Sequence, residues 1–176
     1  MRLDLQTERM TFRPLTLNDL DQLAEIYSDR YVMRFIYGVH TREQTRQRIL
    51  DNLTRYEEYG FGLWATILKT DEQLIGRCGL LPHTIDGRSE VEVAYTLARR
   101  YWGRGLATEA ALAIRDYAFR TLPVDRVIAF VDVDNVASNR VAEKIGMRIE
   151  RDVLFHGDPC NLYYVNRCDA LQSDHS

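Results

Sequence analysis

Hydrophobic and polar residues alternate over residues 3–13, which is the period expected of a strand with one buried face. Two helix starts follow at Thr16 and Thr41, each with a residue three positions later that can return the capping hydrogen bond. We expect these helices to end near Ser28 and Tyr59, because helical spacing of apolar residues stops there. The first third of the chain therefore predicts one strand and two helices.

A hairpin-connected group of strands is expected next, because short apolar runs are separated by polar turns such as Asp86-Gly87. Beyond two closely spaced glycines, apolar positions return to helical spacing, and a β-branched run follows. The expected elements are strands at 61–68, 74–81 and 90–97, a helix at 106–120, a strand at 127–133, a helix at 135–145, and strands near 147–155 and 162–167.

One crossover in this order decides the fold class. The strand at 90–97, the helix at 106–120 and the strand at 127–133 form a βαβ unit, whose two strands run parallel. The sequence thus predicts an α+β protein of three layers, αβα, with a mixed, mostly antiparallel central sheet and one parallel pair. Ligands tend to bind at such irregular strand junctions, so we expect the site beside Glu92 to Tyr95.

Length and charge limit the kind of protein. A chain of 176 residues with 10 Gly and 4 Pro predicts one domain, at residues 1–171, with a disordered tail at 172–176. The net charge of −3 lacks the basic excess of a nucleic-acid-binding protein. The uncharged stretch at 60–68 is far shorter than the ~20 residues of a membrane span, and the acidic residues near Met1 do not fit a secretory signal. We therefore expect a cytoplasmic protein that binds neither nucleic acid nor membrane.

Cysteine spacing gives no sign of a disulfide framework or a metal site. The three cysteines, Cys78, Cys160 and Cys168, form no Cys-x-x-Cys pair and have no histidine at ligand spacing. We expect reduced thiols and no bound metal.

The glycine turn between a strand and the longest apolar helix is the first candidate for chemistry. Gly103 and Gly105 precede the backbone N–H groups of a helix N-terminus, which have no intrahelical partner and can hold an anion. Arg99, Arg100 and Arg104 add positive charge nearby. A pyrophosphate would fit these features, whereas the simpler alternative is a tight turn that enters a helix.

Two familiar phosphate motifs can be compared with this turn. A P-loop is absent because no Gly-Lys-Ser or Gly-Lys-Thr occurs in the chain. A dinucleotide fingerprint fits better, since Asp132 or Asp134 ends the next strand, but Thr108 replaces its third glycine. A dinucleotide-binding module therefore remains the alternative function.

Phrases around the turn resemble the GNAT superfamily of acetyl-CoA-dependent N-acetyltransferases. Its pattern, Gln/Arg-x-x-Gly-x-Gly/Ala, is met by Arg100-x-x-Gly103-x-Gly105, while the register that starts at Trp102 departs at its first residue. Further similar phrases, which look like the ribosomal-protein-alanine N-acetyltransferase branch, are Leu74-Ile75-Gly76, Glu92-Val93-Ala94-Tyr95, Tyr101-Trp102-Gly103, Ala107-Thr108-Glu109-Ala110, and Asn135-Val136-Ala137-Ser138 followed by Glu143 to Met147. The resemblance extends from about Glu8 to Arg167.

This resemblance implies the acyl-CoA N-acyltransferase fold, with acetyl-CoA as co-substrate. The pantetheine arm would lie in a split between the strands at 90–97 and 127–133, with the acetyl group near Val93 and Ala94. A backbone N–H there would stabilise the developing oxyanion. The residues expected to bind the cofactor are Val93, Ala94, Tyr95, Arg100, Gly103, Arg104, Gly105, Leu106, Ala107, Thr108, Asn135 and Ser138.

Acyl transfer to an amine requires the neutral amine, so a carboxylate base is expected. Glu92 occupies the strand position where many family members carry a glutamate, and Glu90, on the same face, is the fallback. The alternative for both is the solvated face of a strand. Many family members protonate the leaving thiolate with a tyrosine, but Ala142 occupies that position here. In the ribosomal-protein branch a serine has this role, and Ser138 matches the position of that serine. Ser138 and Asn135 are also common helix-capping residues.

The remaining candidates are weaker. We expect Tyr163 and Tyr164 to pack in the core. The aromatic segment at 31–37, which in the family lies beside the acceptor, is also expected to belong to the core. His83 is the only histidine that we expect near the cleft. Cys78 with His83 could instead form an acyl-enzyme. We predict direct transfer to a primary amine, on a protein N-terminus or a small molecule, within a ternary complex of a monomer or homodimer. A non-catalytic acyl-CoA-binding protein is the other alternative.

Overall fold

The computed structural model describes residues 5–172, without the side chains of the last two. Its elements are β1 (Met10–Pro14), a 3-10 turn η1 (Leu17–Asp19), α1 (Leu20–Ser28), α2 (Arg42–Tyr59), β2 (Leu63–Leu68), β3 (Gln73–Ile85), β4 (Arg88–Leu97), η2 (Arg99–Tyr101), α3 (Leu106–Thr121), β5 (Arg126–Asp132), α4 (Val136–Lys144), β6 (Arg148–Phe155), β7 (Asp158–Asn166) and α5 (Arg167–Gln172).

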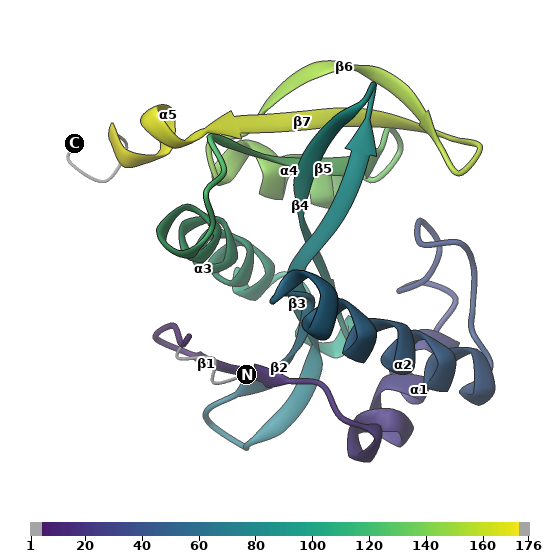
Figure 1. Ribbon diagram of the computed structural model, residues 1–176. Helices are drawn as coiled ribbons and strands as arrows, with labels where there is room; N and C mark the ends of the chain where they lie inside the picture. The colour runs from purple at the N-terminus through teal and green to yellow at the C-terminus, as the bar shows by residue number, and fades with distance from the viewer. Residues whose placement is uncertain (1–4, 173–176) are drawn as a thin grey trace.

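Seven strands form one sheet in the order β1-β2-β3-β4-β5-β7-β6 (Figure 1). Every neighbouring pair is antiparallel except β4 and β5, which run parallel on either side of the α3 crossover. The expected mixed, mostly antiparallel sheet with one parallel pair is therefore confirmed. A doubly wound dinucleotide-binding fold, which needs a mostly parallel sheet, is excluded by this arrangement.

Helices cover both faces of the sheet, as the three-layer prediction requires. Arg77 and Cys78 are neighbours on β3, so their side chains point to opposite faces. Arg77 donates a hydrogen bond to the Tyr27 hydroxyl of α1 over 2.9 Å. On the other face, Trp64, which pairs with Cys78, packs edge-on against Tyr117 of α3 at 5.2 Å between ring centroids. Helices α1 and α3 therefore lie in different layers.

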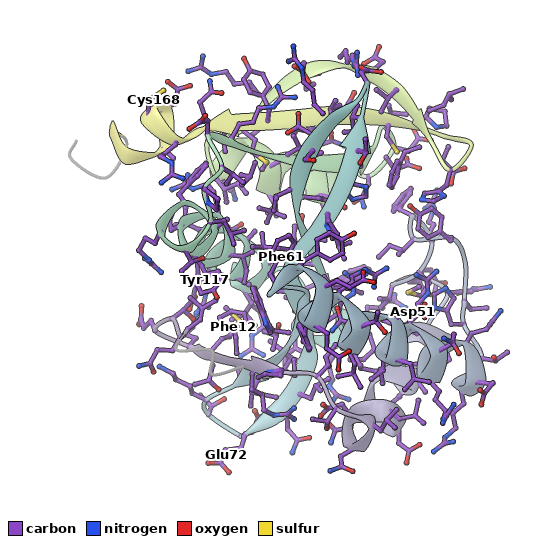
Figure 2. All side chains as sticks on the ribbon, in the orientation of Figure 1. Phe12, Asp51, Phe61, Glu72, Tyr117 and Cys168 are labelled. Carbon is purple, nitrogen blue, oxygen red and sulfur yellow. The ribbon has the colours of Figure 1, made fainter. Side chains whose placement is uncertain are left out.

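Apolar burial holds these layers together. The buried face of α3 carries Ala110, Ala111 and Ala118, all with 0% exposure, and these small side chains let the helix approach the sheet closely. Figure 2 shows the side chains of the layer between β1 and α3, where Phe12 and Tyr117 lie. Gly79 permits a similarly close approach of two strands, because a Cβ there would come within 2.2 Å of the Gly62 carbonyl oxygen.

The sheet is interrupted at the parallel pair. Strand β4 pairs with β3 along its whole length, but with β5 only where Glu92 lies opposite Ile128. Residues 93–97 of β4 therefore have no registered neighbour in β5. This separation leaves one backbone edge of β4 open at the position where the sequence predicts the site.

Two terminal predictions need correction. Residues 3 and 4 of the expected first strand lie outside the described part of the chain. Within that part the strand begins only at Met10, because a turn closed by a hydrogen bond from the Thr7 N–H to the Met10 carbonyl at 2.8 Å interrupts the alternation. The expected tail includes Gln172, which instead belongs to α5, a helix that the pattern did not predict. Residues 173–176 lie outside the described part of the chain.

Candidate active site

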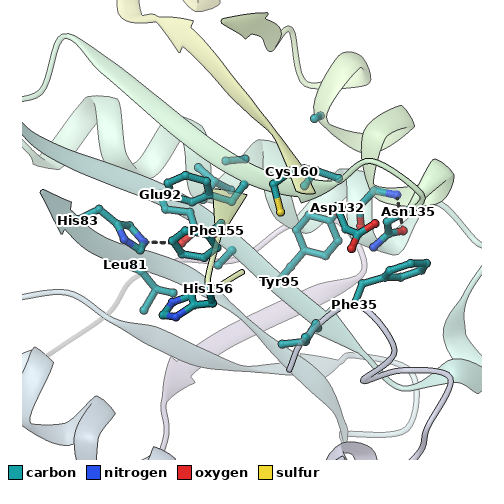
Figure 3. Close-up of a pocket in the computed structure, with 18 of the residues that line it drawn as sticks. Phe35, Leu81, His83, Glu92, Tyr95, Asp132, Asn135, Phe155, His156 and Cys160 are labelled. Atoms are coloured by element: carbon teal, nitrogen blue, oxygen red, sulfur yellow. Dashed lines mark hydrogen bonds and ion pairs between the residues drawn. The ribbon is translucent and has the colours of Figure 1, made fainter. Parts of the chain in front are cut away.

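A pocket of about 430 Å³ opens where β4 and β5 separate (Figure 3). Side chains from both layers of the protein line it, because the separation reaches through the sheet. Glu92, Val93, Ala94, Tyr95, Asn135 and Ser138 are the predicted site residues that border it. The structure thus brings the expected carboxylate and the expected serine to one cavity.

Glu92 and His83 form the polar centre of the pocket. The Glu92 carboxylate lies 2.6 Å from Nε2 of His83, across the β3–β4 hairpin. Glu92 is only 8% exposed, so its negative charge is largely removed from water. Such a pair can take up a proton and pass it on to solvent.

Aromatic rings border this pair. Phe130 and Phe155 stack with their ring centroids 3.8 Å apart, and His83 meets Phe130 edge-on at 5.2 Å. Tyr37 and His156 meet edge-on at 4.7 Å, and both hold a left-handed backbone with φ of 59° and 52°. Non-glycine residues adopt this conformation only at a cost, which is often found at functional sites.

The opposite wall comes from α4 and Tyr95. The Asn135 side chain caps α4 by accepting a hydrogen bond from the Ser138 N–H over 3.2 Å, so the capping role belongs to Asn135. This leaves the Ser138 hydroxyl for another role. The Tyr95 hydroxyl is buried without a hydrogen-bond partner among the described residues. Burial raises the pKa of Tyr95 to about 12, an effect that the neighbouring Ser138 side chain opposes.

The glycine turn lies outside the lining of this pocket, at the start of α3. Gly103 and Gly105 have φ of 73° and 76°, and a Cβ at Gly103 would meet nothing within 4 Å. Gly105 is the N-cap of α3, so the N–H groups that follow, of Leu106, Ala107 and Thr108, belong to an unpartnered first turn. These donors suit an anion, and Nη2 of Arg9 would lie 3.5 Å from a Cβ at Gly105, so a positive charge is close to this turn.

The arginines near this turn lie against aromatic rings or beside a carboxylate. The Arg99 guanidinium lies over the Tyr31 ring at 4.0 Å, and Arg100 lies 3.7 Å from Glu25. Arg104 has its guanidinium 5.8 Å from the Tyr101 ring centre, and its carbonyl accepts a hydrogen bond from Arg9. The backbone donors are therefore better placed than the side chains to hold an anion.

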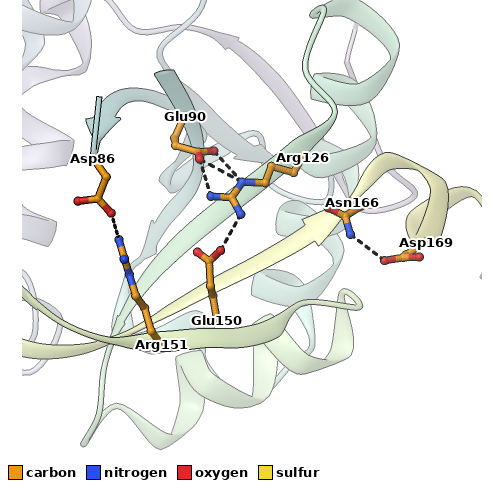
Figure 4. A network of polar contacts seen from close by, with 7 residues as sticks. All are labelled: Asp86, Glu90, Arg126, Glu150, Arg151, Asn166 and Asp169. Carbon is orange, nitrogen blue, oxygen red and sulfur yellow. Dashed lines mark hydrogen bonds and ion pairs between the residues drawn. The ribbon is translucent and has the colours of Figure 1, made fainter. Parts of the chain in front are cut away.

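Glu90, the fallback base, has a different environment from Glu92. Its carboxylate accepts hydrogen bonds from Arg126, with Nε at 3.0 Å, and Arg126 also binds Glu150 at 2.9 Å (Figure 4). Glu90 is 6% exposed and does not line the pocket. The interpretation of these glutamates as a solvated strand face is wrong, because both side chains are buried. Arg126 and His83 compensate this burial by hydrogen bonding to them.

The structure does not assemble the cysteine alternative. Cys78 and His83 are an odd number of residues apart on β3, so they face opposite sides of the sheet. Burial raises the pKa of the Cys78 thiol to about 12, which keeps it protonated and a poor nucleophile. Tyr163 is buried, as expected, with its hydroxyl bonded to Asn139 at 2.9 Å.

Several lining residues were not predicted, or were predicted for the core. Phe35, Ile36 and Tyr37 border the pocket, whereas Val32 and Met33 of the same segment belong to the core. His156 also lines the pocket, so His83 is not the only histidine there. Other lining residues without a sequence signal are Arg48, Arg55, Arg77, Phe155, Asp158 and Cys160. Their positions depend on loops and on the opposite helical layer, which no local pattern places.

Residues 5–172 contain neither a metal-binding cluster nor a membrane-spanning helix. No group of three or more His, Cys, Asp or Glu side chains could hold a metal ion there. In the same part of the chain, every helix is too short or too polar to cross a membrane.

A mixed sheet with one parallel pair that separates, together with a glycine turn at the start of the crossover helix, is the arrangement of acyl-CoA N-acyltransferases. The family model described as an acetyltransferase (GNAT) domain matches residues 9–148. The chain belongs to the GNAT acetyltransferase family, which confirms the expected enzyme class and its acetyl-CoA co-substrate.

Individual relatives agree with this assignment. YkkB of Bacillus subtilis strain 168 is 35% identical over 162 residues, which cover 90% of this chain and 93% of that protein. The uncharacterized N-acetyltransferase YnaD of the same strain is 31% identical over 147 residues, with 83% of each chain covered. The crystal structure of a GNAT-family acetyltransferase from Bacillus anthracis is similar with a TM-score of 0.78 and 28% identity, covering 92% of this chain and 97% of that one.

Proposed function

We propose that this protein transfers the acetyl group of acetyl-CoA directly to a primary amine that enters the pocket beside Glu92. The acceptor is a small molecule or the N-terminus of a protein. The observation that carries this proposal is the separation of β4 from β5 after the single pair Glu92–Ile128. It leaves an open strand edge between a buried carboxylate and a helix N-terminus, which is the shape that a long thioester with a diphosphate needs.

The proposed position of the donor follows from the unpartnered groups of the chain. The amide groups of the pantetheine arm would extend along residues 93–95, where β4 lacks a neighbour in β5. The pyrophosphate would lie on the N–H groups after Gly103 and Gly105, helped by the α3 dipole. The thioester would then lie between Glu92 and Ser138, which border the same pocket.

Glu92 is the proposed base for the acceptor amine. An ammonium group has no lone pair, so one proton must leave before attack on the thioester carbonyl. The carboxylate can accept it, directly or through water, and His83 at 2.6 Å can pass it toward solvent. A backbone N–H of the open β4 edge would stabilise the developing oxyanion.

Ser138 and Tyr95 are the proposed donors to the leaving thiolate. Asn135 performs the capping of α4, so the Ser138 hydroxyl can turn toward the pocket. The buried Tyr95 hydroxyl lacks a hydrogen-bond partner among the described residues, and a tyrosine hydroxyl is protonated at neutral pH. Both groups can therefore donate a hydrogen bond to sulfur as the carbon–sulfur bond breaks.

The experiment that tests this function is thiol release from acetyl-CoA in the presence of a panel of amines. We expect release that depends on both substrates, with mass increases of one acetyl group on the acceptor. Kinetics should show no burst of thiol without acceptor, because the transfer is direct. Release that is independent of every amine would contradict the proposal.

A melting experiment separates the remaining alternatives. CoA should raise the melting temperature while NAD leaves it unchanged, since only the former fits the split and the glycine turn together. The reverse result would contradict the proposed CoA site. Binding of CoA without turnover of any amine would indicate a non-catalytic acyl-CoA-binding protein.

A further inference from the structure

Three arginines line the pocket, and the proposed acetyl transfer assigns none of them a role. Arg48 and Arg55 extend from α2, and Arg77 extends from β3 toward the same layer. Arg48 and Arg55 are seven residues apart, which places them on one face of the helix. Within residues 5–172, neither forms an ion pair, whereas Arg42 on the same helix binds Asp21 at 2.8 Å.

Arg77 carries the clearest sign of a missing partner. Its Nε donates to the Tyr27 hydroxyl over 2.9 Å, but its Nη1 is buried with no hydrogen-bond partner in the described part of the chain. A buried charged donor without a partner is costly, so such groups are rare unless a ligand completes them. The side chain lines the pocket, and a ligand in the pocket can supply the acceptor.

Within residues 5–172, no ion pair joins these arginines to a carboxylate of the pocket. Burial lowers the pKa of His40, and the charges of Arg48 and Arg77 lower it further, so both arginines lie near this ring. The carboxylates that line the pocket are Glu92, Asp132 and Asp158, on β4, β5 and β7. Arg77 lies opposite Thr96, four residues from Glu92, which corresponds to about 13 Å along the strand.

The pocket therefore holds three arginines without a carboxylate partner in the described part of the chain, and Arg77 is four positions along the sheet from the buried Glu92, while Asp132 of β5 lies at the level of Thr96. We propose that the acceptor carries an anionic group, a carboxylate or a phosphate, which binds at Arg48, Arg55 and Arg77 while its amine reaches Glu92. This inference rests on the proposed acetyl transfer and adds the substrate class. Amino acids, short peptides and amine phosphates have both charges, whereas polyamines and aminoglycosides would bring a second cation to the arginines.

Aromatic residues line the same pocket. Phe35 and Tyr37 line the pocket on the segment that joins α1 and α2, near the arginines, and Phe130 and Phe155 stack beside His83. They offer an apolar surface to the carbon chain that separates the amine from the anion. They also limit water, which strengthens an arginine–carboxylate or arginine–phosphate contact.

The test compares acceptors that differ only in the anionic group. 6-Aminohexanoate is compared with 6-aminohexanamide, and 6-aminohexyl phosphate with 6-aminohexanol, with the chain length then varied by single methylenes. At least one charged acceptor should have a kcat/KM ten or more times that of its neutral partner. The pair with the larger ratio identifies the carboxylate or the phosphate as the group that the site prefers.

Arginine variants connect this preference to the site. Arg48→Gln and Arg77→Gln should raise KM for the charged acceptor about tenfold or more, with KM for acetyl-CoA unchanged. Arg48→Glu should reverse the preference toward 1,6-diaminohexane. Arg42→Gln, on the same helix but paired with Asp21 outside the pocket, is the matched control and should keep the wild-type ratio. Because Arg48 is exposed, its variants are expected to fold even if those of Arg77 do not.

The result that would overturn the inference is equal use of charged and neutral acceptors, or a rise in KM for acetyl-CoA in Arg77→Gln with every acceptor. The latter would assign Arg77 to the phosphates of CoA. If no amine is acetylated at all, the proposed function fails. The anion site is then tested separately, by the binding of 6-aminohexanoate and its amide. A melting shift with 6-aminohexanoate that exceeds the shift with its amide and is lost in Arg48→Gln would support the site, and equal shifts would refute it.

Discussion

Single residues decide which of two similar glutamates can act on a substrate. Glu90 and Glu92 share a strand face, and alternation alone predicts them as equivalent. The structure separates them by partner, since Glu90 binds Arg126 and Glu92 meets His83 in the pocket. The resemblance could name Glu92, but the His83 contact depends on the register of the β3–β4 hairpin, which the sequence does not determine in detail.

Replacing Glu92 with Gln tests its role as base. We expect kcat/KM to fall about 100-fold at neutral pH, within the usual range for loss of a general base. The deficit should shrink as pH approaches the ~10.4 typical of an alkyl ammonium, because the acceptor then loses its proton without help. The measurement is a pH–rate profile of both enzymes with one acceptor.

Two control variants accompany this profile. Glu57→Gln changes an exposed carboxylate on α2 and should leave the profile unchanged. Glu90→Gln should lower the free energy of unfolding by about 1–3 kcal/mol, because it leaves Arg126 short of a charged partner. A profile of Glu92→Gln parallel to that of the wild type would remove Glu92 as base.

Ser138 and Tyr95 allow a test of the thiolate donors. Ser138→Ala and Tyr95→Phe should each lower kcat about tenfold, since a hydrogen bond to a charged group is lost. The double variant should lose less than the product of the two effects, because both hydroxyls serve one sulfur. Fully multiplicative effects with unchanged melting temperatures would indicate that the hydroxyls act independently.

At the level of elements, local patterns predicted most helices and strands. The capping box at Thr41 was confirmed, with its side chain accepting from the Gln44 N–H, and α2 ends at Gly60 in a left-handed conformation. The first strand was predicted too long, because side-chain alternation continued through a turn that Thr7 closes. Helix α5 was missed because it has only six residues, too few to show a helical period.

The start of α1 provides a pH-dependent prediction. The buried Asp19 side chain accepts from both Nη atoms of Arg13, at 2.6 and 2.9 Å, and from the Thr16 N–H at 2.8 Å. Burial raises the pKa of Asp19, but these hydrogen bonds outweigh that effect and hold the pKa below its usual value. The resulting stability is present above the unfolded-state pKa of ~3.9 and is lost as pH falls through the lower folded-state pKa.

Asp19→Asn should therefore be less stable than the wild type by about 1–3 kcal/mol at pH 7. The difference should shrink as the pH falls below ~4 and the wild-type carboxyl becomes protonated. Urea unfolding between pH 7 and pH 2 measures this. A difference that stays constant with pH would show that the carboxylate charge contributes nothing.

At the scale of the whole molecule, topology was predicted better than the pocket. The βαβ unit required a parallel pair, which the structure has at β4 and β5. The position of β7 between β5 and β6 could not be predicted, because a hairpin can join a sheet edge by either strand. Arg48 and Arg77 belong to a helix and a strand that meet only in the folded protein, so sequence spacing carried no sign of their proximity.

A crystal structure with bound CoA tests the central claim most directly. The account predicts pantetheine between β4 and β5 alongside residues 93–95, and the pyrophosphate within hydrogen-bond distance of the N–H groups that follow Gly103. Coenzyme bound at another surface, with β4 and β5 closed against each other and no density at the glycine turn, would contradict it.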